Sequence, residues 1–143
     1  MNLLPGIQST TAALTAERTR LDTIAQNIAN ANTTRGLDGK PYQRQQVVFE
    51  SVLERARTSN GVEPQMSGPR VAKIERDTRP LRSICQPGHA DADPKTGMVK
   101  MPNVNIHEEM ADLIAASRTF DANIAVLKTA KQMTMQALSI GKR

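Results

Sequence analysis

The sequence predicts a mainly α-helical fold with a small β part. Apolar residues recur at helical spacings in both terminal segments, whereas prolines and turn residues gather between them. We therefore expect long N- and C-terminal helices paired as a coiled coil, with a central segment of short strands and extended loops. With 143 residues, the chain has enough material for one domain with a modest core.

The same pattern divides the chain into three segments. We expect an N-terminal coiled-coil helix within residues 1–32, a central segment of strands and loops within residues 33–103, and a C-terminal coiled-coil helix within residues 104–143. The two terminal segments would together form one helical domain.

A heptad of aliphatic residues predicts the N-terminal helix, which we expect to run from about residue 7 to residue 31. The segment "NANTTRG" ends it, because Asn30, Asn32 and Gly36 favour turn and left-handed conformations. The aliphatic positions are Ile7, Leu14, Leu21 and Ile28, with Ile24 three positions beyond Leu21.

Two apolar rows predict the C-terminal helix. Asn105 is the expected N-cap, and Glu108 lies at the position from which a side chain can bond the backbone amide of the cap residue. The first row contains Met110, Leu113, Ser117, Phe120, Ile124 and Leu127, and the second contains Val126, Ala130, Met133, Ala137 and Ile140. Because the first helix is too short to cover both rows, we expect neighbouring chains to supply the missing contacts.

The central segment carries signals for short strands separated by turns. Residues 47–49 and 71–77 are the two candidate strands. Six prolines between residues 64 and 102 interrupt the segment, so we expect loops around these strands and no compact sheet.

The basic charge leaves nucleic-acid binding open as an alternative function. The net charge is +5, and a basic residue recurs at every third position in the series Arg70, Lys73, Arg76, Arg79 and Arg82. Such a series could follow a phosphate backbone if the segment were extended. No aromatic residue alternates with these arginines to stack on bases, so a solvated or partner-facing surface is favoured.

Residues that could carry chemistry do not form a recognised motif. Cys85 and His89 lack the second ligand pair that a zinc site requires, and "DADPKTG" lacks the late glutamate of a calcium loop. Neither a nucleophile motif nor a glycine-rich phosphate loop is present. We therefore expect no metal, no cofactor and no enzymatic activity. We also expect neither a cleaved signal peptide nor direct lipid insertion.

Several sequence motifs resemble those of the proximal rod proteins of the bacterial flagellar basal body. They are "IAQNIANANTT", "GLDGKPYQRQQVVF", "PGHADAD", "MPNVN" and "SRTFDAN", and the resemblance covers nearly the whole chain. It implies a structural subunit that is exported through the flagellar type III apparatus and assembles helically in the periplasm. The implied partners are other copies of the chain, other rod proteins and the export apparatus, without nucleic acid. The assembly would be the drive shaft that transmits torque from the motor to the hook.

On this interpretation the residues of interest fall into three groups. The helix seam and subunit interface would use Ile7, Leu14, Leu21, Ile24, Ile28, Met110, Leu113, Phe120, Ile124 and Leu127. Turns and caps would use Asn27, Asn30, Asn32, Asn105 and Glu108, and lateral contacts would use Arg70, Arg76, Arg79 and Arg82. Besides the nucleic-acid alternative, a secreted regulatory or chaperone-binding helical protein of the same export system remains open.

Overall fold

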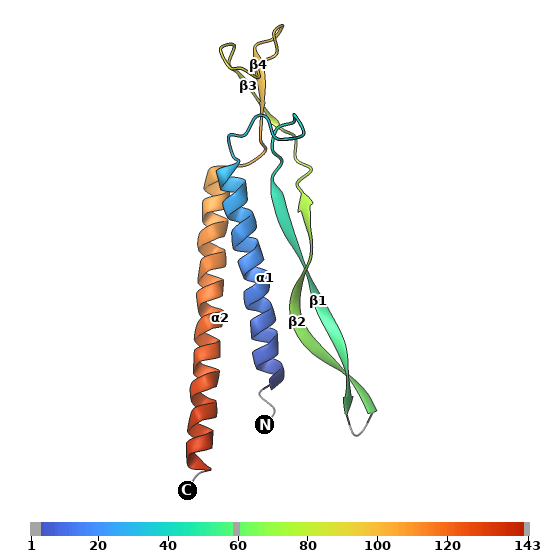
Figure 1. Ribbon diagram of the computed structural model, residues 1–143, viewed down its shortest axis with the longest axis vertical. Coiled ribbons are helices and arrows are strands. Elements are labelled where there is room, and N and C mark those ends of the chain that lie inside the picture. Colours follow the sequence, from blue (N-terminus) through green and yellow to red (C-terminus); the bar gives the residue numbers. More distant parts are fainter. Residues whose placement is uncertain (1–3, 59–60, 142–143) are drawn as a thin grey trace.

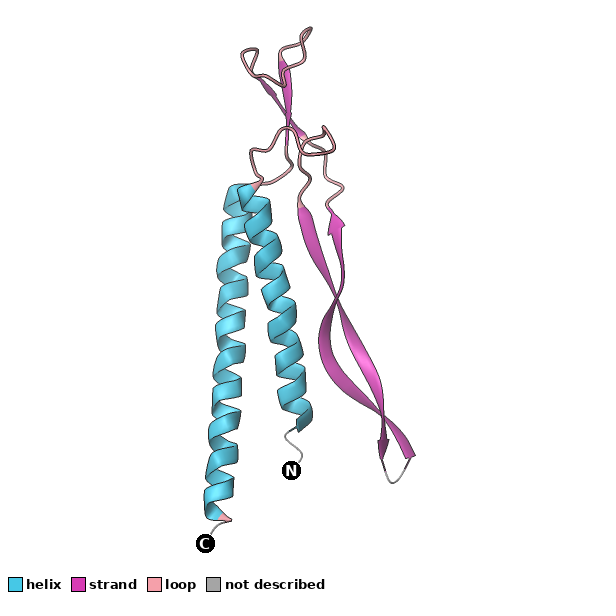
Figure 2. Ribbon diagram, in the orientation of Figure 1, coloured by secondary structure: helices cyan, strands magenta, loops and turns pink. Residues whose placement is uncertain are grey.

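The structure is a computed structural model that describes residues 4–58 and 61–141. Its elements follow in the order α1 (Leu4–Ala29), β1 (Gln45–Thr58), β2 (Gly61–Arg76), β3 (Arg82–Cys85), β4 (Met98–Met101) and α2 (Ile106–Ile140). Long helices at both ends with antiparallel strands between them confirm the predicted fold class (Figure 2).

The two helices lie side by side and run in opposite directions (Figure 1). Helix α1 has 26 residues and helix α2 has 35, so α2 is longer by about 14 Å at 1.5 Å per residue. The C-terminal end of α2 consequently extends beyond the start of α1 (Figure 1). Every residue from 131 to 140 is exposed.

Asn30 and Asn32 lie in the turn that ends α1, as predicted, but neither they nor Gly36 adopt a left-handed conformation. Among the described residues, only Gly39, Gly68 and Gly97 have a positive φ. The side-chain amide and backbone N–H of Asn30 both donate to the carbonyl of Gln26, at 2.9 and 3.0 Å. These bonds satisfy a terminal carbonyl of the helix, which is the role that a left-handed residue often serves.

Strands β1 and β2 form a long twisted hairpin that lies beside α1 (Figure 1). They contain 14 and 16 residues, so both are much longer than the predicted strands. Pro64 and Pro69 lie within β2 and do not end it. In a two-stranded sheet each strand has a free edge, and a proline nitrogen can face that edge without removing a bond between the strands.

A smaller hairpin made by β3 and β4 lies at the far end of the molecule from the chain termini (Figure 1). Its strands pair from Arg82 with Met101 to Cys85 with Met98. The turn between them is closed by a bond from the backbone N–H of Gln86 to the carbonyl of Gly97, at 2.8 Å.

The core is small for a chain of this size. The buried apolar residues among those described are Ala16, Ile24, Ala31, Val99, Val104 and Ala116, and three of these six are alanines. The accessible surface is 10699 Å². A compact monomer of this mass would expose about 7,200 Å². The chain is therefore an extended molecule whose elements leave much of their surface uncovered.

The close approach of α1 to β2 at Gly68 predicts a specific sensitivity. A Cβ atom at Gly68 would lie 2.9 Å from Ser9 Oγ and 3.0 Å from Ser9 Cα, and φ is +103°. Gly39 also has a positive φ, of +69°, but a Cβ there would meet nothing within 4 Å. Gly39→Ala should cost about 1–2 kcal/mol from backbone strain alone. Gly68→Ala should cost at least about 1 kcal/mol more because of the overlap.

Urea unfolding followed by the fluorescence of Tyr42 measures both variants, since Tyr42 is the only tyrosine and the chain has no tryptophan. Equal losses of unfolding free energy in the two variants would show that the hairpin does not pack on α1 at this point.

Candidate functional site: a buried polar node and the exposed helix faces

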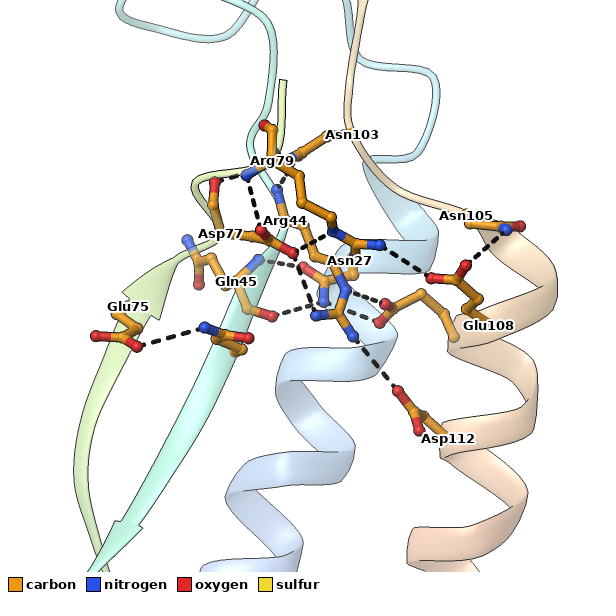
Figure 3. Close-up of polar contacts among 12 residues, drawn as sticks. Asn27, Arg44, Gln45, Glu75, Asp77, Arg79, Asn103, Asn105, Glu108 and Asp112 are labelled. Atoms are coloured by element: carbon orange, nitrogen blue, oxygen red, sulfur yellow. Dashed lines mark hydrogen bonds and ion pairs between the residues drawn. The ribbon is translucent and has the colours of Figure 1, made fainter. Parts of the chain in front are cut away.

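A cluster of largely buried polar side chains joins α1, α2 and the two ends of the large hairpin (Figure 3). This cluster, here named the node, consists of Asn27, Tyr42, Arg44, Asp77, Arg79, Asn103, Glu109 and Asp112 with the backbone of Gln45. At its centre is Asn27, which is only 1% exposed. The Asn27 amide donates to the carbonyl of Gln45 at 2.8 Å and to Glu109 Oε2 at 2.9 Å. Its oxygen accepts from the backbone N–H of Gln45 and the hydroxyl of Tyr42, both at 2.9 Å. The side chain thereby uses both amide hydrogens and both oxygen lone pairs.

Glu109 provides the buried charge of the node. Its side chain is fully buried on α2, and Oε1 accepts a hydrogen bond from Arg44 Nε. The Arg44 side chain is 15% exposed and also approaches Asp77 at 3.5 Å and Asp112 at 3.4 Å. A buried carboxylate requires such a partner, because removal of a charge from water is costly unless it is paired and hydrogen-bonded.

Asn103 joins the chain entering the large hairpin to the chain leaving it. Its oxygen accepts from the backbone N–H of Arg44 at 2.8 Å, and its amide donates to the carbonyl of Arg79 at 3.0 Å. The backbone N–H of Asp77 donates to the carbonyl of Arg44 at 2.8 Å. Asn103 therefore holds the two ends of the hairpin together just before α2 begins.

The node shifts the pKa values of three residues. The backbone N–H of Arg79, with further help from its guanidinium and that of Arg44, lowers the pKa of Asp77. Hydrogen bonds to Asp77 and Glu108 raise the pKa of Arg79. Burial and, to a smaller extent, the charge of Glu109 raise the pKa of Tyr42. These shifts favour a charged Asp77, a charged Arg79 and a neutral Tyr42.

The N-terminus of α2 is capped by Asn105, whose side chain accepts from the backbone N–H of His107 at 3.2 Å. Glu108 Oε1 accepts from the side-chain amide of Asn105 at 3.1 Å, whereas the sequence predicted a bond to the backbone amide of Asn105. The second oxygen of Glu108 lies 3.3 Å from Arg79 Nη1. Competition from this arginine accounts for the different orientation of Glu108.

Of the three asparagines predicted to form the turn after α1, one lies inside the helix and two lie in the turn. Asn27 lies inside α1 and belongs to the node, so it does not form the turn. Asn30 follows the end of α1 and bonds Gln26, while Asn32 is exposed in the turn that follows.

The residues predicted for the helix seam are buried to different extents in the single chain. Ile24 is buried, Met110 is 52% exposed, and the others are half-buried. Ala16 and Ala116, which the sequence analysis did not include, are more deeply buried than most of the predicted set. Small side chains at these positions allow the helix backbones to approach closely. The other residues of the predicted set are Ile7, Leu14, Leu21, Ile28, Leu113, Phe120, Ile124 and Leu127.

The arginines proposed for lateral contacts are all exposed on the β part of the chain or next to it. Arg70 forms an ion pair with Glu50 on the neighbouring strand, at 2.9 Å. Arg79 pairs with Asp77 and Glu108. Arg76 and Arg82 lie near the ends of β2 and β3. Because carboxylates already neutralise two of the four arginines, the series does not present a continuous row of free cations to a phosphate backbone.

The residues considered for metal binding support a turn instead. His89 Nδ1 accepts from the backbone N–H of Asp91 at 3.0 Å, and Asp93 Oδ1 accepts from that of Lys95 at 2.9 Å. Among the described residues, no group of three or more His, Cys, Asp or Glu side chains is positioned to hold a metal ion. Within residues 4–58 and 61–141, neither helix is apolar enough over a sufficient length to cross a membrane.

Local sequence patterns do not predict the charged centre of the node. Arg44 and Glu109 are 65 positions apart, and nothing local to either residue indicates a partner. One signal was present, because Glu109 falls on the same helical face as Leu113, Ala116 and Phe120. A carboxylate on the apolar face of a helix indicates a buried ion pair or hydrogen-bonded group.

Family models for flagellar proteins match both helical ends of the chain. The model described as "Flagella basal body rod protein" matches residues 7–35. The model described as "Flagellar basal body rod FlgEFG protein C-terminal" matches residues 95–140. The matched regions contain most of α1 and the whole of α2, with Asn27, Asn103 and Glu109 of the node, whereas Arg44 and Asp77 lie between them. Both ends of the chain are thus similar to flagellar basal-body rod proteins.

Curated relatives define the family more narrowly. The chain is 40% identical to the flagellar basal-body rod protein FlgC of Borreliella burgdorferi over 98% of both chains. It is 40% identical to FlgC of Yersinia enterocolitica over 99% of this chain and 100% of the relative, and 35% identical to FlgC of Bacillus subtilis over the same shares. The chain belongs to the FlgC family of flagellar basal-body rod proteins. This membership assigns it a structural, non-enzymatic role in the basal body, and nothing in these similarities favours nucleic-acid binding.

The node predicts that loss of a buried ion pair lowers the unfolding free energy much more than loss of an exposed one. Arg44→Met leaves Glu109 buried without its cation and should cost about 3–5 kcal/mol of unfolding free energy. The double variant with Arg44→Met and Glu109→Met should lose less than the sum of the two single variants, because no buried charge remains unpaired. Urea unfolding followed by Tyr42 fluorescence measures the cycle.

The exposed pair of Arg70 and Glu50 is the matched control. Its side chains are 70% and 45% exposed, so Arg70→Met should cost only about 0–1 kcal/mol. Similar losses for Arg44→Met and Arg70→Met would contradict the central position of Arg44.

Proposed function

We propose that this chain is a structural subunit of the proximal rod, where it assembles helically with copies of itself and with other rod proteins. The near full-length similarity to FlgC proteins from several bacteria carries this proposal. Assembled in the periplasm, the subunits would form the drive shaft that transmits torque from the motor to the hook.

The large uncovered surface of the single chain supports assembly. It exceeds that of a compact monomer by about 3,500 Å², roughly twice the total area of a standard protein interface. A shaft built from long helices resists twist through many small contacts acting in parallel. The terminal segments, residues 1–32 and 104–143, would form one helical domain, with residues 33–103 as the central segment.

We further propose that the chain is exported unfolded through the flagellar type III apparatus without a cleaved signal peptide. A chain with few fully buried apolar residues gains little from folding alone, so it can pass through a narrow channel in an unfolded state. Contacts with neighbouring subunits then stabilise the folded form by mass action. On this proposal the exposed residues Arg70, Arg76, Arg79 and Arg82 take part in lateral contacts after assembly.

Substitution of a seam residue tests the proposed role. Leu21 is half-buried on α1. If it belongs to the proposed seam, Leu21→Asp puts a carboxylate between the helices at a cost of several kcal/mol. The variant should be absent from purified basal bodies, and its strain should be non-motile. Gln26→Asp adds the same charge at an exposed position of the same helix and should leave motility unchanged. Normal swimming of the Leu21→Asp strain would show that Leu21 is not part of a helix seam that the rod requires.

A further inference from the structure

Helix α2 carries two exposed apolar rows at opposite ends. The first, here named the proximal row, consists of Ile106, Met110 and Ile114, which are 41–53% exposed. The second, here named the distal row, includes Val126, Met133 and Ile140, which are 50–76% exposed. Side chains four positions apart lie on one flank of a helix, so the proximal row forms a short continuous ridge.

The two rows lie on different flanks of α2. Met110 and Met133 are 23 positions apart, which separates them by about 35 Å along the helix and about 140° around it. Asp112 lines a cleft together with Arg44 and Phe49, so the flank that carries Asp112 faces the large hairpin. The same helical geometry puts Val126 on the flank of Asp112 and Met110 on the flank away from the hairpin.

The distal row borders a groove between the helices. Residues of both helices line this groove, which measures about 480 Å³, and its walls are mainly apolar. From α1 it includes Ile7 and Thr10, and from α2 it includes Val126, Ala130 and Met133. Beside the bulky Met133, Ala130 and Thr129 are small and leave space for an inserted side chain.

We propose that the proximal row of one copy inserts into the groove beside the distal row of a second copy. This inference rests on the proposed assembly role and identifies the two surfaces involved. Ridge and groove belong to opposite ends and flanks of one helix, so the contact is heterologous and repeats without closing on itself. With Met110 of one copy beside Met133 of the next, parallel α2 helices are staggered by about 35 Å.

A second copy fits this groove because the chain itself supplies a matching ridge. The proximal row is on the flank away from the hairpin, so it approaches the groove without its own hairpin intervening. The uncovered area of about 3,500 Å² is enough for two interfaces of standard size, one at the ridge and one at the groove.

Disulfide cross-linking in assembled rods tests the proposal. Cys85 is the only cysteine and is exposed, so Cys85→Ser gives a cysteine-free chain. In that background we would introduce Met110→Cys and Met133→Cys together, oxidise purified basal bodies and separate them on a non-reducing gel. These two positions are about 35 Å apart within one chain, far beyond the reach of a disulfide, so every cross-link joins two chains. The expected result is a series of covalent dimers and larger multimers of this chain.

In a matched control, the second cysteine is at position 135 (Met135→Cys) instead of position 133. Met135 is at least as exposed as Met133, at 61% against 50%, but points about 160° away from it, so the pair with Met110→Cys should remain monomeric. A second pair, Ile114→Cys with Ala137→Cys, keeps the same separation of 23 positions and serves if the first variant does not assemble.

Three outcomes would overturn the proposal. The first is that assembled rods with either cysteine pair give only monomers on the gel. The second is that the Met135→Cys control forms as many cross-links as the Met133→Cys variant, and the third is that the cross-linked product contains a different rod protein. Motility and the presence of the chain in basal bodies are scored separately. Motile strains with assembled rods and no cross-link would disprove the ridge and groove contact while leaving the rod role intact. Absence of even the cysteine-free chain from basal bodies would disprove the rod role itself.

Discussion

The buried ion pair of Arg44 with Glu109, together with Asn27, is the interaction on which the arrangement of the molecule depends. It joins α1, the start of the large hairpin and α2 at one point. The buried residues of the two helices include Ala16, Thr23 and Ala116, whose small side chains do little to prevent the helices from sliding past one another. A fully bonded amide and a buried carboxylate have few alternative partners, so they fix the register of the helices and the direction of the hairpin.

Away from the node the molecule cannot enclose a core of its own. Two helices and a two-stranded ribbon have too few faces to cover one another, and α2 continues beyond the start of α1 (Figure 1). Large apolar side chains, such as Met133, Leu138 and Ile140, are therefore exposed in the isolated chain. The combination of one fixed end with an uncovered opposite end agrees with the proposal that the chain is exported unfolded and completes its packing among neighbours.

The helices were predictable because strong periodicity over many residues leaves few alternatives, and the cap at Asn105 follows from local sequence. The hairpin was underestimated because prolines in β2 were interpreted as breaks, although a two-stranded ribbon tolerates them at its free edges. Asn27 was assigned to a turn because asparagine favours turns, whereas its burial depends on partners 18 and 82 positions away. Contacts between such distant residues are set by tertiary packing, which local propensity does not encode.

Hydrogen exchange of backbone amides in the purified chain and in purified basal bodies tests most directly whether assembly completes the fold. In the isolated chain, amides around Asn27 and Glu109 should be protected, while those of residues 131–140 should exchange rapidly because no neighbouring chain covers that part of α2. In basal bodies both regions should be protected. Equal, strong protection of residues 131–140 in the isolated chain would contradict the account, because that end of α2 would then be stable without neighbours.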